Sequence, residues 1–384
     1  MHGLLFPLIA LCFTILLLVP LLKRFHQPYL VAYIMAGIII GPHVLGVFAE
    51  PGPVESVGEL GVMLLMFFLG MEIDVPDKRS ELLTPIAAQV VRTLLGAVVA
   101  AIAGHLLGWT LPAIVLLIVL LSFNSTAVVS EFLKKQGELQ TDHGKMVLNI
   151  LLLQDILLAP ALTVFQLLGG QPVDVVRVLS AAGGSVLIFL LLRAIRNRNL
   201  LQLPLVKELE QDHDWQVFAA ACICLGFGGL ASLMGLTSAI GSFAAGIFIG
   251  RTKAFHWLGE VLQPFKVFFT ALFFVSIGII LDLHYLLQHG WLLISITLLI
   301  MLINTLLSVA VFRTFKLPWR KSLYAGALLS QTGEFGLLAC SLAGSMQIIS
   351  PEVLKASLAI TGLSLLLSTL WMGIVRRYTH QTAR

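Results

Sequence analysis

Long apolar stretches recur along the whole sequence, separated by short polar segments. Most of them approach the roughly 20 residues that an α-helix needs to cross a bilayer, and several are short or interrupted by Gly and Pro. The pattern predicts an all-α polytopic membrane protein with about thirteen transmembrane helices in a single domain over residues 1–384. The predicted spans are 4–21, 29–47, 57–73, 82–107, 111–133, 146–169, 174–195, 215–233, 236–250, 264–281, 287–312, 319–345 and 352–375.

The basic residues between these stretches test the count of spans. With thirteen spans, all but three of the 24 lysines and arginines fall on one side of the membrane. Of the three, Arg177 and Lys355 fall on the other side, and Arg92 lies inside a span. A missed or additional span would mix the two sides. Because basic loops stay in the cytoplasm, the pattern predicts an outside N-terminus and a cytoplasmic C-terminus in the cell (inner) membrane.

Three landmarks repeat in the same order and at nearly the same spacing. AGIIIGP (36–42) matches AGIFIGR (245–251), LGMEID (69–74) matches IGIILD (277–282), and SFNST from Ser122 matches SQTGE from Ser330. Each span matches the span seven positions later, so the second copy is inverted in the membrane. We predict a first repeat at 1–170, a linker helix at 174–195 and a second repeat at 215–376, as is typical of secondary transporters. The glycine pairs also suit close helix packing.

The composition agrees with a membrane protein and narrows the function. Hydrophobic residues make up 58% of the sequence and charged residues 11%, against roughly a quarter charged in soluble domains. The four cysteines lie scattered in apolar runs, which gives neither a disulfide framework nor a metal-ligand pattern. The sequence shows no Ser-His or paired-Asp arrangement of a hydrolase. We expect no enzyme activity, no cofactor and no nucleic-acid partner; the lipid bilayer surrounds the protein.

Two spans carry polar residues at mid-depth, at positions that the repeat relates. The first span, 111–133, holds Ser122, Asn124, Ser125 and Thr126, and the second, 319–345, holds Gln331, Thr332 and Glu334. Such residues suit locally unwound helices around a small polar cavity, and the repeat predicts that the two breaks meet. Hydrogen bonding between intact helices is the alternative.

Gln154 and Asp155 lie at mid-depth of the span 146–169. A charged carboxylate costs about 2.5–3.5 kcal/mol at the centre of a transmembrane helix, so we expect Asp155 to face a cavity or a partner. A proton and a monovalent cation can each neutralise it, and their competition for one carboxylate is sufficient for exchange. Gln154 would add a neutral carbonyl oxygen.

Arg92 offers a structural alternative for both deep carboxylates. Asp155 is either the shared ion site or half of a buried ion pair with Arg92 or another cation. Glu334 is either a residue of the ion path or the partner of Arg92. We expect Asn304, in the span 287–312, to make an interhelical hydrogen bond.

The motifs, taken in order, resemble the monovalent cation:proton antiporter-2 family, close to the membrane domain of the glutathione-regulated potassium-efflux (Kef-type) antiporters. They are YLVAYIMAGIIIGP, LGVMLLMFFLGMEID, SFNSTAVVSEFL, LLLQDILLAP and SQTGEFGLLA. The resemblance implies a sodium/proton-antiporter-like fold with crossed broken helices, and a homodimer. It also implies a dimerisation part at 1–73 and 215–281 and a core transport part at 82–169 and 287–375, which moves like an elevator.

The resemblance further implies the transported ions. Electrogenic relatives carry Asp-Asp where this chain has Gln154 and Asp155. One titratable group fewer favours electroneutral exchange, with K⁺ (or Na⁺) bound at Asp155 and Gln154 in competition with H⁺. The other expected ion- and proton-binding residues are Asn124, Ser125, Thr126, Thr332 and Glu334, supported by Asn304, Arg92, Ser122 and Gln331.

Two departures from the family bear on the mechanism. Many relatives carry a lysine where this chain has Asn304, so Asp155 would take the proton alone. The potassium-efflux proteins continue into a cytoplasmic nucleotide-binding regulatory domain, whereas this sequence ends at RRYTHQTAR, soon after the last predicted span. Such a domain or subunit would be a partner outside this chain, and we claim no glutathione or nucleotide control for the chain itself.

Three other functions stay open from the residues alone. A sodium/proton antiporter differs only in its cation. A gated K⁺ channel would conduct through the cavity at Asp155 without an obligatory proton flux. A sensor or scaffold built on a transporter fold would not need the Asp155 carboxylate.

Overall fold

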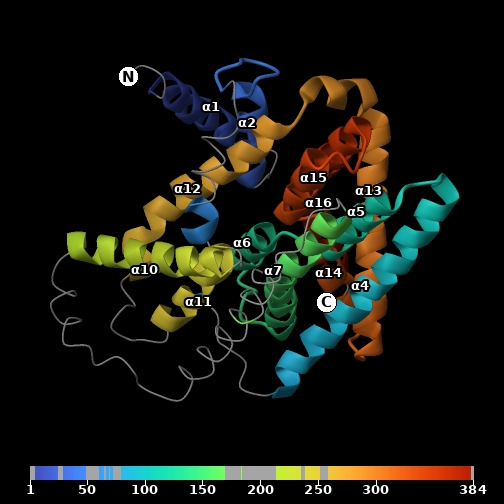
Figure 1. The fold of residues 1–384 in the computed structure, drawn as a ribbon. Helices are drawn as coiled ribbons and strands as arrows, with labels where there is room; N and C mark the ends of the chain where they lie inside the picture. Colours follow the sequence, from blue (N-terminus) through green and yellow to red (C-terminus); the bar gives the residue numbers. More distant parts are fainter. Residues whose placement is uncertain are drawn as a thin grey trace. The chain divides into compact units, whose positions relative to one another are not determined.

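The computed structural model describes residues 5–24, 29–48, 60–64, 66–68, 70–71, 79–168, 183, 213–234, 238–250 and 258–381. The regular structure of these residues is helical (Figure 1). The helices are α1 (Leu5–Arg24), α2 (Tyr29–Ile40), α4 (Arg79–Leu107), α5 (Leu111–Ser122), α6 (Thr126–Lys135), α7 (Asp142–Leu168), α10 (His213–Leu233), α11 (Ser238–Gly250), α12 (Leu258–Ile280), α13 (Leu283–Thr314), α14 (Trp319–Leu328), α15 (Glu334–Ser345) and α16 (Pro351–Gln381).

The helices follow the predicted spans. The span at 57–73 is described in part, and the span at 174–195 lies outside the described residues except for residue 183. Two spans are broken, since α5 and α6 share one of them and α14 and α15 share another. Among the described residues, five helical segments are long and apolar enough to cross a membrane, with α5 and α6 counted as one. The expected all-α membrane fold is confirmed.

Local sequence explains where the half-helices begin and end. Phe123, which follows α5, has an extended backbone with φ −111° and ψ 120°. Ser125 caps α6, because its side chain accepts a hydrogen bond from the Val128 N–H. α14 begins after Pro318, and α15 begins after Gly333, which is also extended. Lipid offers the freed backbone groups no partners, so both breaks need polar partners within the protein.

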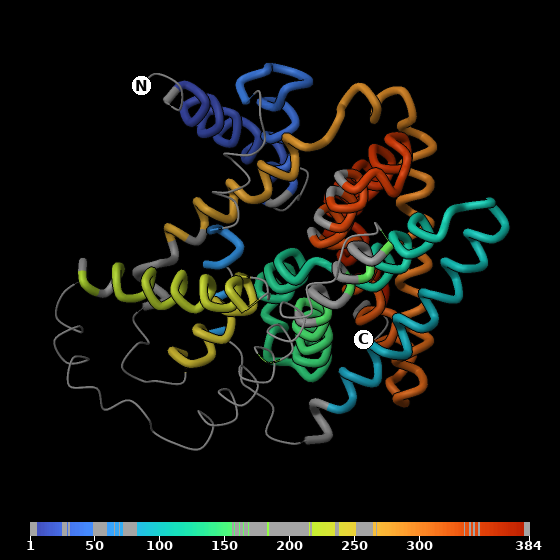
Figure 2. The backbone as a smooth tube through the Cα atoms, in the orientation of Figure 1, coloured from blue at the N-terminus to red at the C-terminus, as the bar shows by residue number. Residues whose placement is uncertain are grey.

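The chain forms two compact units. The first comprises Met1–Pro51, Lys78–Val173 and Phe274–Arg384, and the second comprises Gly52–Asp77 and Asp174–Phe273. In the first unit α4 packs on α5 and α7, and α13 packs on α14 and α16. α5 and α15 also lie side by side, although they are far apart in sequence (Figure 2). In the second unit α10 packs on α11. The division into a dimerisation part and a mobile core is defined by movement, and it stays a prediction.

Pairs of glycines let helix backbones touch within each unit. In the first unit, a Cβ on Gly37 of α2 would lie 2.9 Å from the Cα of Gly278 of α12. In the second unit, a Cβ on Gly246 of α11 would lie 3.1 Å from the Cα of Gly70. The repeat makes Gly37 equivalent to Gly246 and Gly278 equivalent to Gly70, so one contact occurs in both units, as the inverted repeat predicts. The close packing expected of the glycine pairs is confirmed.

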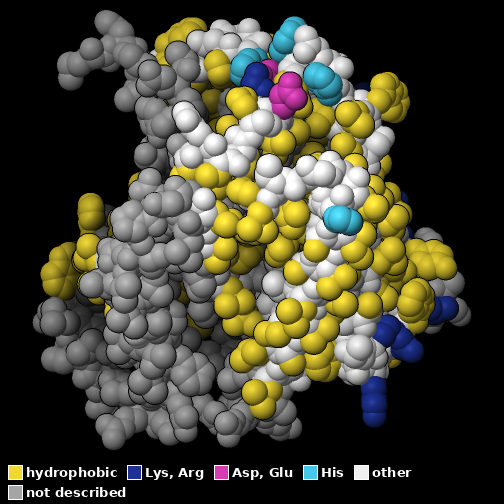
Figure 3. Space-filling view, turned by 45° about the vertical axis from the view of Figure 1, so that its right-hand side comes forward, with side chains coloured by type: hydrophobic (Ala, Val, Ile, Leu, Met, Phe, Trp, Pro, Cys, Tyr) yellow, Lys and Arg dark blue, Asp and Glu magenta, His cyan; other side chains and the backbone are white. Residues whose placement is uncertain are grey.

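Apolar side chains cover the outward faces of α4 and α13. Leu94 and Ile102 of α4 are 62% and 56% exposed, and Trp291 and Leu299 of α13 are 87% and 54% exposed. Figure 3 shows hydrophobic side chains over much of this face, with most charged side chains toward its ends. An apolar surface of this extent is unfavourable in water but matches the hydrocarbon of a bilayer.

Candidate functional site

The two helix breaks cross in backbone contact. The Gly333 N–H donates to the Phe123 carbonyl at 2.9 Å. A Cβ on Gly333 would lie 2.6 Å from the carbonyl carbon of Asn124 and 2.8 Å from the Ser125 nitrogen. These neighbours are main-chain atoms that cannot rotate away, so the crossing requires glycine. The predicted meeting of the two breaks is confirmed.

Asn124 is fully buried and ties the first break to the second break and to α7. Its Nδ2 donates to the Leu329 carbonyl at 3.2 Å and to the Gln331 carbonyl. Its backbone N–H donates to Gln154 Oε1 at 2.8 Å, and its Oδ1 accepts from Gln154 Nε2 at 3.2 Å. Asn124 therefore supplies partners to backbone groups that the breaks release from the helices.

Gln154 holds the first break against α4 as well as α7. Besides its bonds to Asn124, its Nε2 donates to Gln89 Oε1 on α4 at 2.9 Å. Both ends of the amide are thus hydrogen-bonded, and Oε1 has one further lone pair to offer a cation. The structure shows a positioning role for Gln154 that the sequence did not predict.

Asp155 follows Gln154 on α7 and is 3% exposed. Thr126 Oγ1, from the first residue of α6, lies 3.2 and 3.3 Å from its two carboxylate oxygens. Thr126 begins α6, and a helix N-terminus carries a partial positive charge and N–H groups without helical partners. The structure therefore brings Asp155 together with the first helix break.

Arg92 of α4 is buried at the crossing and hydrogen-bonds to neutral oxygens. Its Nη1 donates to the Ser122 carbonyl and its Nη2 to the Leu329 carbonyl, each at 3.1 Å. Its Nε donates to Ser308 Oγ of α13 at 3.0 Å. Among the described residues, Arg92 does not form an ion pair with Asp155. Such a pair was one of the alternatives that the sequence left open.

Asn304 of α13 lies beside this guanidinium. Its Oδ1 is 3.5 Å from Arg92 Nη2, and its Nδ2 donates to the Ser330 carbonyl at 3.1 Å. The expected interhelical hydrogen bond of Asn304 is confirmed, and it joins α13 to the second break.

The remaining predicted residues lie around the same crossing. The hydroxyls of Thr332 and of Ser364 on α16 are 2.6 Å apart. Gln331 Oε1 and Ser122 Oγ are buried with no hydrogen-bond partner among the described residues, and such oxygens are suited to water or a cation. Glu334 is the first residue of α15, and its side chain lies outside the described residues.

Three polar residues of this network escaped the sequence analysis. Gln89 Nε2 donates to the Ser122 carbonyl at 3.2 Å, and Ser308 and Ser364 bond to Arg92 and Thr332 as described above. Gln89 precedes Arg92 by three residues, and residues at that spacing share a helix face. The spacing of three residues from Arg92 could therefore have identified Gln89 as part of the same polar face of α4.

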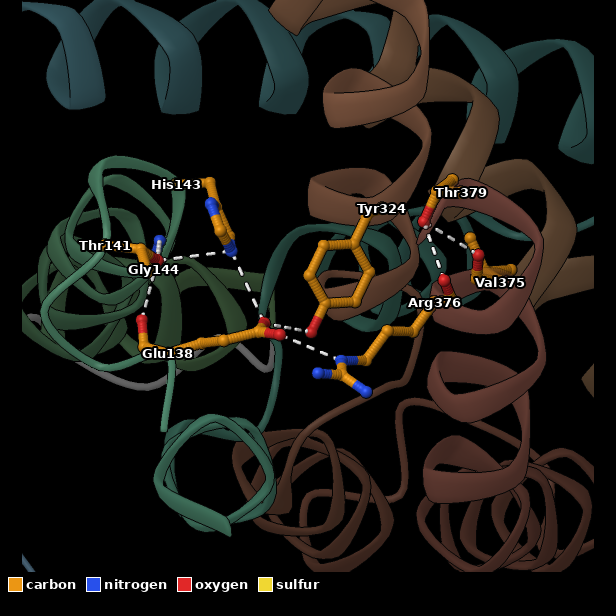
Figure 4. Close-up of polar contacts among 8 residues, drawn as sticks. All are labelled: Glu138, Thr141, His143, Gly144, Tyr324, Val375, Arg376 and Thr379. Atoms are coloured by element: carbon orange, nitrogen blue, oxygen red, sulfur yellow. Dashed lines mark hydrogen bonds and ion pairs between the residues drawn. The ribbon is translucent and has the colours of Figure 1, made fainter. Parts of the chain in front are cut away.

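A second polar cluster, also missed, surrounds Glu138 in the loop between α6 and α7. Its carboxylate lies 2.8 Å from Arg376 Nε, 2.6 Å from Tyr324 Oη and 3.4 Å from His143 Nε2. Figure 4 shows it between His143 of α7 and the side chains from α14 and α16. Burial alone would raise the pKa of Glu138, but the hydrogen bonds with His143, Tyr324 and Arg376 outweigh it and lower the pKa to about 2. The cluster thus connects α7, α14 and α16 to this loop.

Comparison with known proteins identifies the family. The sequence matches the family model described as "Sodium/hydrogen exchanger, transmembrane" over residues 9–376. The chain belongs to this family of sodium/hydrogen exchangers. The solved structure of the sodium proton antiporter MjNhaP1 from Methanocaldococcus jannaschii matches with a TM-score of 0.68 and covers 97% of this chain and 98% of that one. At 14% identity the likeness concerns the fold, and it confirms the sodium/proton-antiporter-like fold.

The proteins that are similar in sequence are named for different cations. The iron transporter MagA of Paramagnetospirillum magneticum is 30% identical, over 94% of this chain and 83% of that protein. The K(+) efflux antiporters 4 and 6 of Arabidopsis thaliana are 29% and 30% identical over 92% of this chain. The chain spans only 61% and 60% of their lengths. The resemblance to potassium-efflux antiporters is confirmed.

Proposed function

We propose that the chain is an electroneutral K⁺/H⁺ antiporter in which Asp155 holds a proton and a cation in turn. The observation that carries the proposal is a carboxylate with 3% exposure, bonded to Thr126 at the first turn of α6 beside the crossing of two broken helices. Membership of the exchanger family supports cation/proton exchange as the general activity.

The surroundings of Asp155 suit a site that binds a proton and a monovalent cation in turn. Burial disfavours a bare charge, whereas Thr126 and the helix N-terminus favour the ionised carboxylate. A monovalent cation about 4 Å away adds roughly 4 kcal/mol of attraction at an effective dielectric constant of 20. A proton neutralises the same carboxylate by a covalent bond. Either the proton or the cation neutralises the carboxylate. The charged carboxylate without a bound proton or cation is unfavourable in free energy to move through the membrane.

A single deep carboxylate at this position accounts for electroneutral exchange. Gln154 is neutral, and its amide is held by Asn124 and Gln89. With one titratable group at positions 154 and 155, one H⁺ exchanges for one monovalent cation. The names of the plant relatives support K⁺, and the name of the bacterial relative makes Fe²⁺ a further cation to test.

We propose the family's transport cycle for this chain. A core at 82–169 and 287–375 moves like an elevator against a dimerisation part at 1–73 and 215–281, within a homodimer in the cell (inner) membrane. The network that joins α4, α7 and α13 to both breaks supports a core that moves as one piece. The distribution of basic residues supports a cytoplasmic C-terminus.

Proton flux in proteoliposomes with a trapped pH dye tests this function. K⁺, Na⁺, Li⁺ or, without oxygen, Fe²⁺ is added in turn, with and without valinomycin. Wild type is compared with Asp155→Asn and with Asp142→Asn, which alters an exposed carboxylate on the same helix. We expect K⁺-driven proton movement that is lost in Asp155→Asn, kept in Asp142→Asn and not limited by the membrane potential.

The other outcomes separate the alternatives. The same behaviour driven by Na⁺ would identify a sodium/proton antiporter. A K⁺ current that reverses with the K⁺ gradient, without proton movement, would identify a channel. Proton exchange that survives in Asp155→Asn would overturn the assignment of the site. Folded, inserted protein that moves no protons with any cation would overturn the antiporter function.

A further inference from the structure

We propose that His43, Asp282 and Lys355, which we call the outer cluster, hold the core transport part against the dimerisation part and hold it more firmly when His43 is protonated. The inference rests on the proposed elevator cycle and adds a regulation of that cycle by pH. It concerns the outer ends of the helices rather than the crossing of the two breaks.

Asp282 lies in the short connection between α12 and α13. α12 ends at Ile280 and α13 begins at Leu283. The Asp282 carboxylate accepts the Tyr285 N–H at 3.0 Å and thereby caps α13. In the proposed cycle the dimerisation part ends at residue 281 and the core transport part resumes at residue 287. Any movement of the core has to be accommodated in the backbone around Asp282.

α16, which belongs to the proposed core, holds this connection at two points. Lys355 Nζ lies 3.4 Å from Asp282 Oδ2. About two turns further along α16, a Cβ on Gly362 would lie 2.5 Å from Leu281 Cδ2, so the Leu281 side chain fills the space beside this glycine. The sequence places Lys355 on the side of the membrane that holds few basic residues. The contact with Asp282 gives this exceptional lysine a role.

His43 approaches the same carboxylate from the loop that follows α2. Its Nδ1 lies 3.8 Å from Asp282 Oδ1, and α2 belongs to the proposed dimerisation part. α16 also packs on α2. Each oxygen of Asp282 thus faces a basic group from a different part of the protein. Separation of the core from the dimerisation part therefore lengthens at least one of the two contacts.

The charges around Asp282 make the outer cluster sensitive to pH. Partial burial would raise the pKa of Asp282, but the Tyr285 N–H, His43 and Lys355 outweigh it and lower the pKa. Asp282 and Lys355 therefore keep their charges between about pH 5 and pH 8, where a histidine side chain changes its charge. Protonated His43 is attracted by Asp282 and repelled by Lys355. Because Asp282 contacts both, the attraction is the stronger of the two. His284, the other histidine near this end of α13, pairs with Gln288.

A distance between spin labels on the two parts reports the conformation without relying on transport. One label is attached at Leu45→Cys, in the loop after α2, and the other at Leu106→Cys, near the end of α4. Both side chains are exposed, at 60% and 77%. The exposed Cys12 and Cys222 are replaced by serine. Labelled protein is diluted with unlabelled protein before reconstitution, so that double electron–electron resonance measures distances within one chain, over a range of K⁺ concentration at about pH 5 and pH 8.

Asp282→Asn removes the charge and keeps a side chain that caps helices well. We expect it to lower the population of the main wild-type distance relative to other distances by about twofold to fivefold, as for a partly exposed ion pair. Lys355→Gln should have an effect in the same direction, and Asp282→Asn/Lys355→Gln should change no more than Asp282→Asn alone. Glu352→Gln, an exposed carboxylate on α16, is the matched control.

His43→Gln tests the dependence on pH. Its distances should differ from those of wild type at pH 5 and agree with them at pH 8, because only protonated His43 adds an attraction. His284→Gln, at an exposed position of α13, should match wild type at both pH values. Comparison at equal pH removes the contribution of every other group that titrates, including Asp155.

Wild-type distances in Asp282→Asn, or additive effects of Asp282→Asn and Lys355→Gln, would overturn the restraint. An equal effect of His43→Gln at both pH values, or no effect at either, would overturn its dependence on pH. A single distance under every condition, shared by wild type and all variants, would show that the outer cluster restrains no movement. K⁺-driven proton flux is measured on the same samples. If wild type moves no protons, the proposed exchange fails, and the distances still decide on the outer cluster.

Discussion

Gln154 and Asn124 are joined by two hydrogen bonds that run in opposite directions. Gln154 Oε1 accepts from the Asn124 backbone N–H at 2.8 Å, and Gln154 Nε2 donates to Asn124 Oδ1 at 3.2 Å. The pairing fixes the first helix break against α7. Asp155, the next residue of α7, is thereby held at the break. Position 154 shapes the site whether or not its oxygen contacts a cation.

We predict that Gln154→Glu exchanges much more slowly than wild type. The variant keeps the size of the side chain but replaces its donor by an oxygen that faces Asn124 Oδ1 and Gln89 Oε1. A buried group left unsatisfied costs about 1–3 kcal/mol, which corresponds to a rate about 5-fold to 150-fold lower. Proteoliposome flux measures the effect, with Gln288→Glu at an exposed position of α13 as the control. An unimpaired Gln154→Glu variant would contradict a role for the pairing.

Thr126→Val should weaken the binding of the exchanged cation. The hydroxyl lies 3.2 Å from the Asp155 carboxylate, and the variant removes this hydrogen bond. A hydrogen bond to a charged group is worth about 1.5–3 kcal/mol, so half-maximal exchange should need a K⁺ concentration that is about 10-fold to 150-fold higher. The control is Thr297→Val, since the Thr297 hydroxyl bonds to the Leu293 carbonyl within α13. An unchanged dependence on K⁺ in Thr126→Val would show that the hydroxyl does not contribute to the site.

Glu138→Gln should lower the free energy of unfolding by about 1.5–3 kcal/mol at neutral pH, because it weakens the charged hydrogen bond with Arg376. The pKa of Glu138 falls from 4.5 to about 2 on folding. Its ionised form therefore stabilises the fold fully above pH 4.5, and this contribution is lost as the pH falls from 4.5 to about 2. The difference in stability between wild type and Glu138→Gln should shrink over that interval.

Unfolding in detergent by a chemical denaturant at several pH values measures this difference. Glu352→Gln, which changes an exposed carboxylate on α16, should leave the stability within about 0.5 kcal/mol of wild type. A Glu138→Gln variant as stable as this control at neutral pH would show that the cluster in Figure 4 does not stabilise the protein.

Gly333→Ala should reduce both stability and exchange. The added Cβ would lie 2.6 Å from the Asn124 carbonyl carbon, and the two breaks must separate to admit it. Overpacking of this kind costs about 1–3 kcal/mol, here directly at the site. Gly373→Ala on α16, where a Cβ meets nothing within 4 Å, is the control for thermal unfolding and flux. Normal exchange in Gly333→Ala would mean that the backbone contact is dispensable.

The helices and their breaks could be predicted because they depend on local composition. An apolar run has to form a helix in lipid, and polar residues with glycine at mid-depth, such as Asn124 and Gly333, mark its interruption. The repeated glycine motifs then indicated which breaks meet. The boundaries of the two compact units were not predicted, since they depend on packing between segments distant in sequence.

The partners of the buried charges could not be predicted in the same way. The sequence places Arg92 and Asp155 inside spans, and opposite charges in a low dielectric suggest an ion pair. The acceptors that Arg92 uses at the ends of α5 and α14 are main-chain carbonyls, which no residue type reveals. Glu138 and Arg376 are 238 positions apart, and each alone resembles a solvated charge at a helix end.

The glycine contacts make the residues allowed in one repeat depend on the other repeat. Each contact takes one residue from each copy, Gly37 with Gly278 and Gly70 with Gly246. A lipid-facing position can change without affecting the other repeat. A larger residue in one of these contacts is tolerated only if the backbone of the opposite copy gives way. The halves of such a protein can therefore be exchanged between relatives only where both bring small residues to the shared contacts.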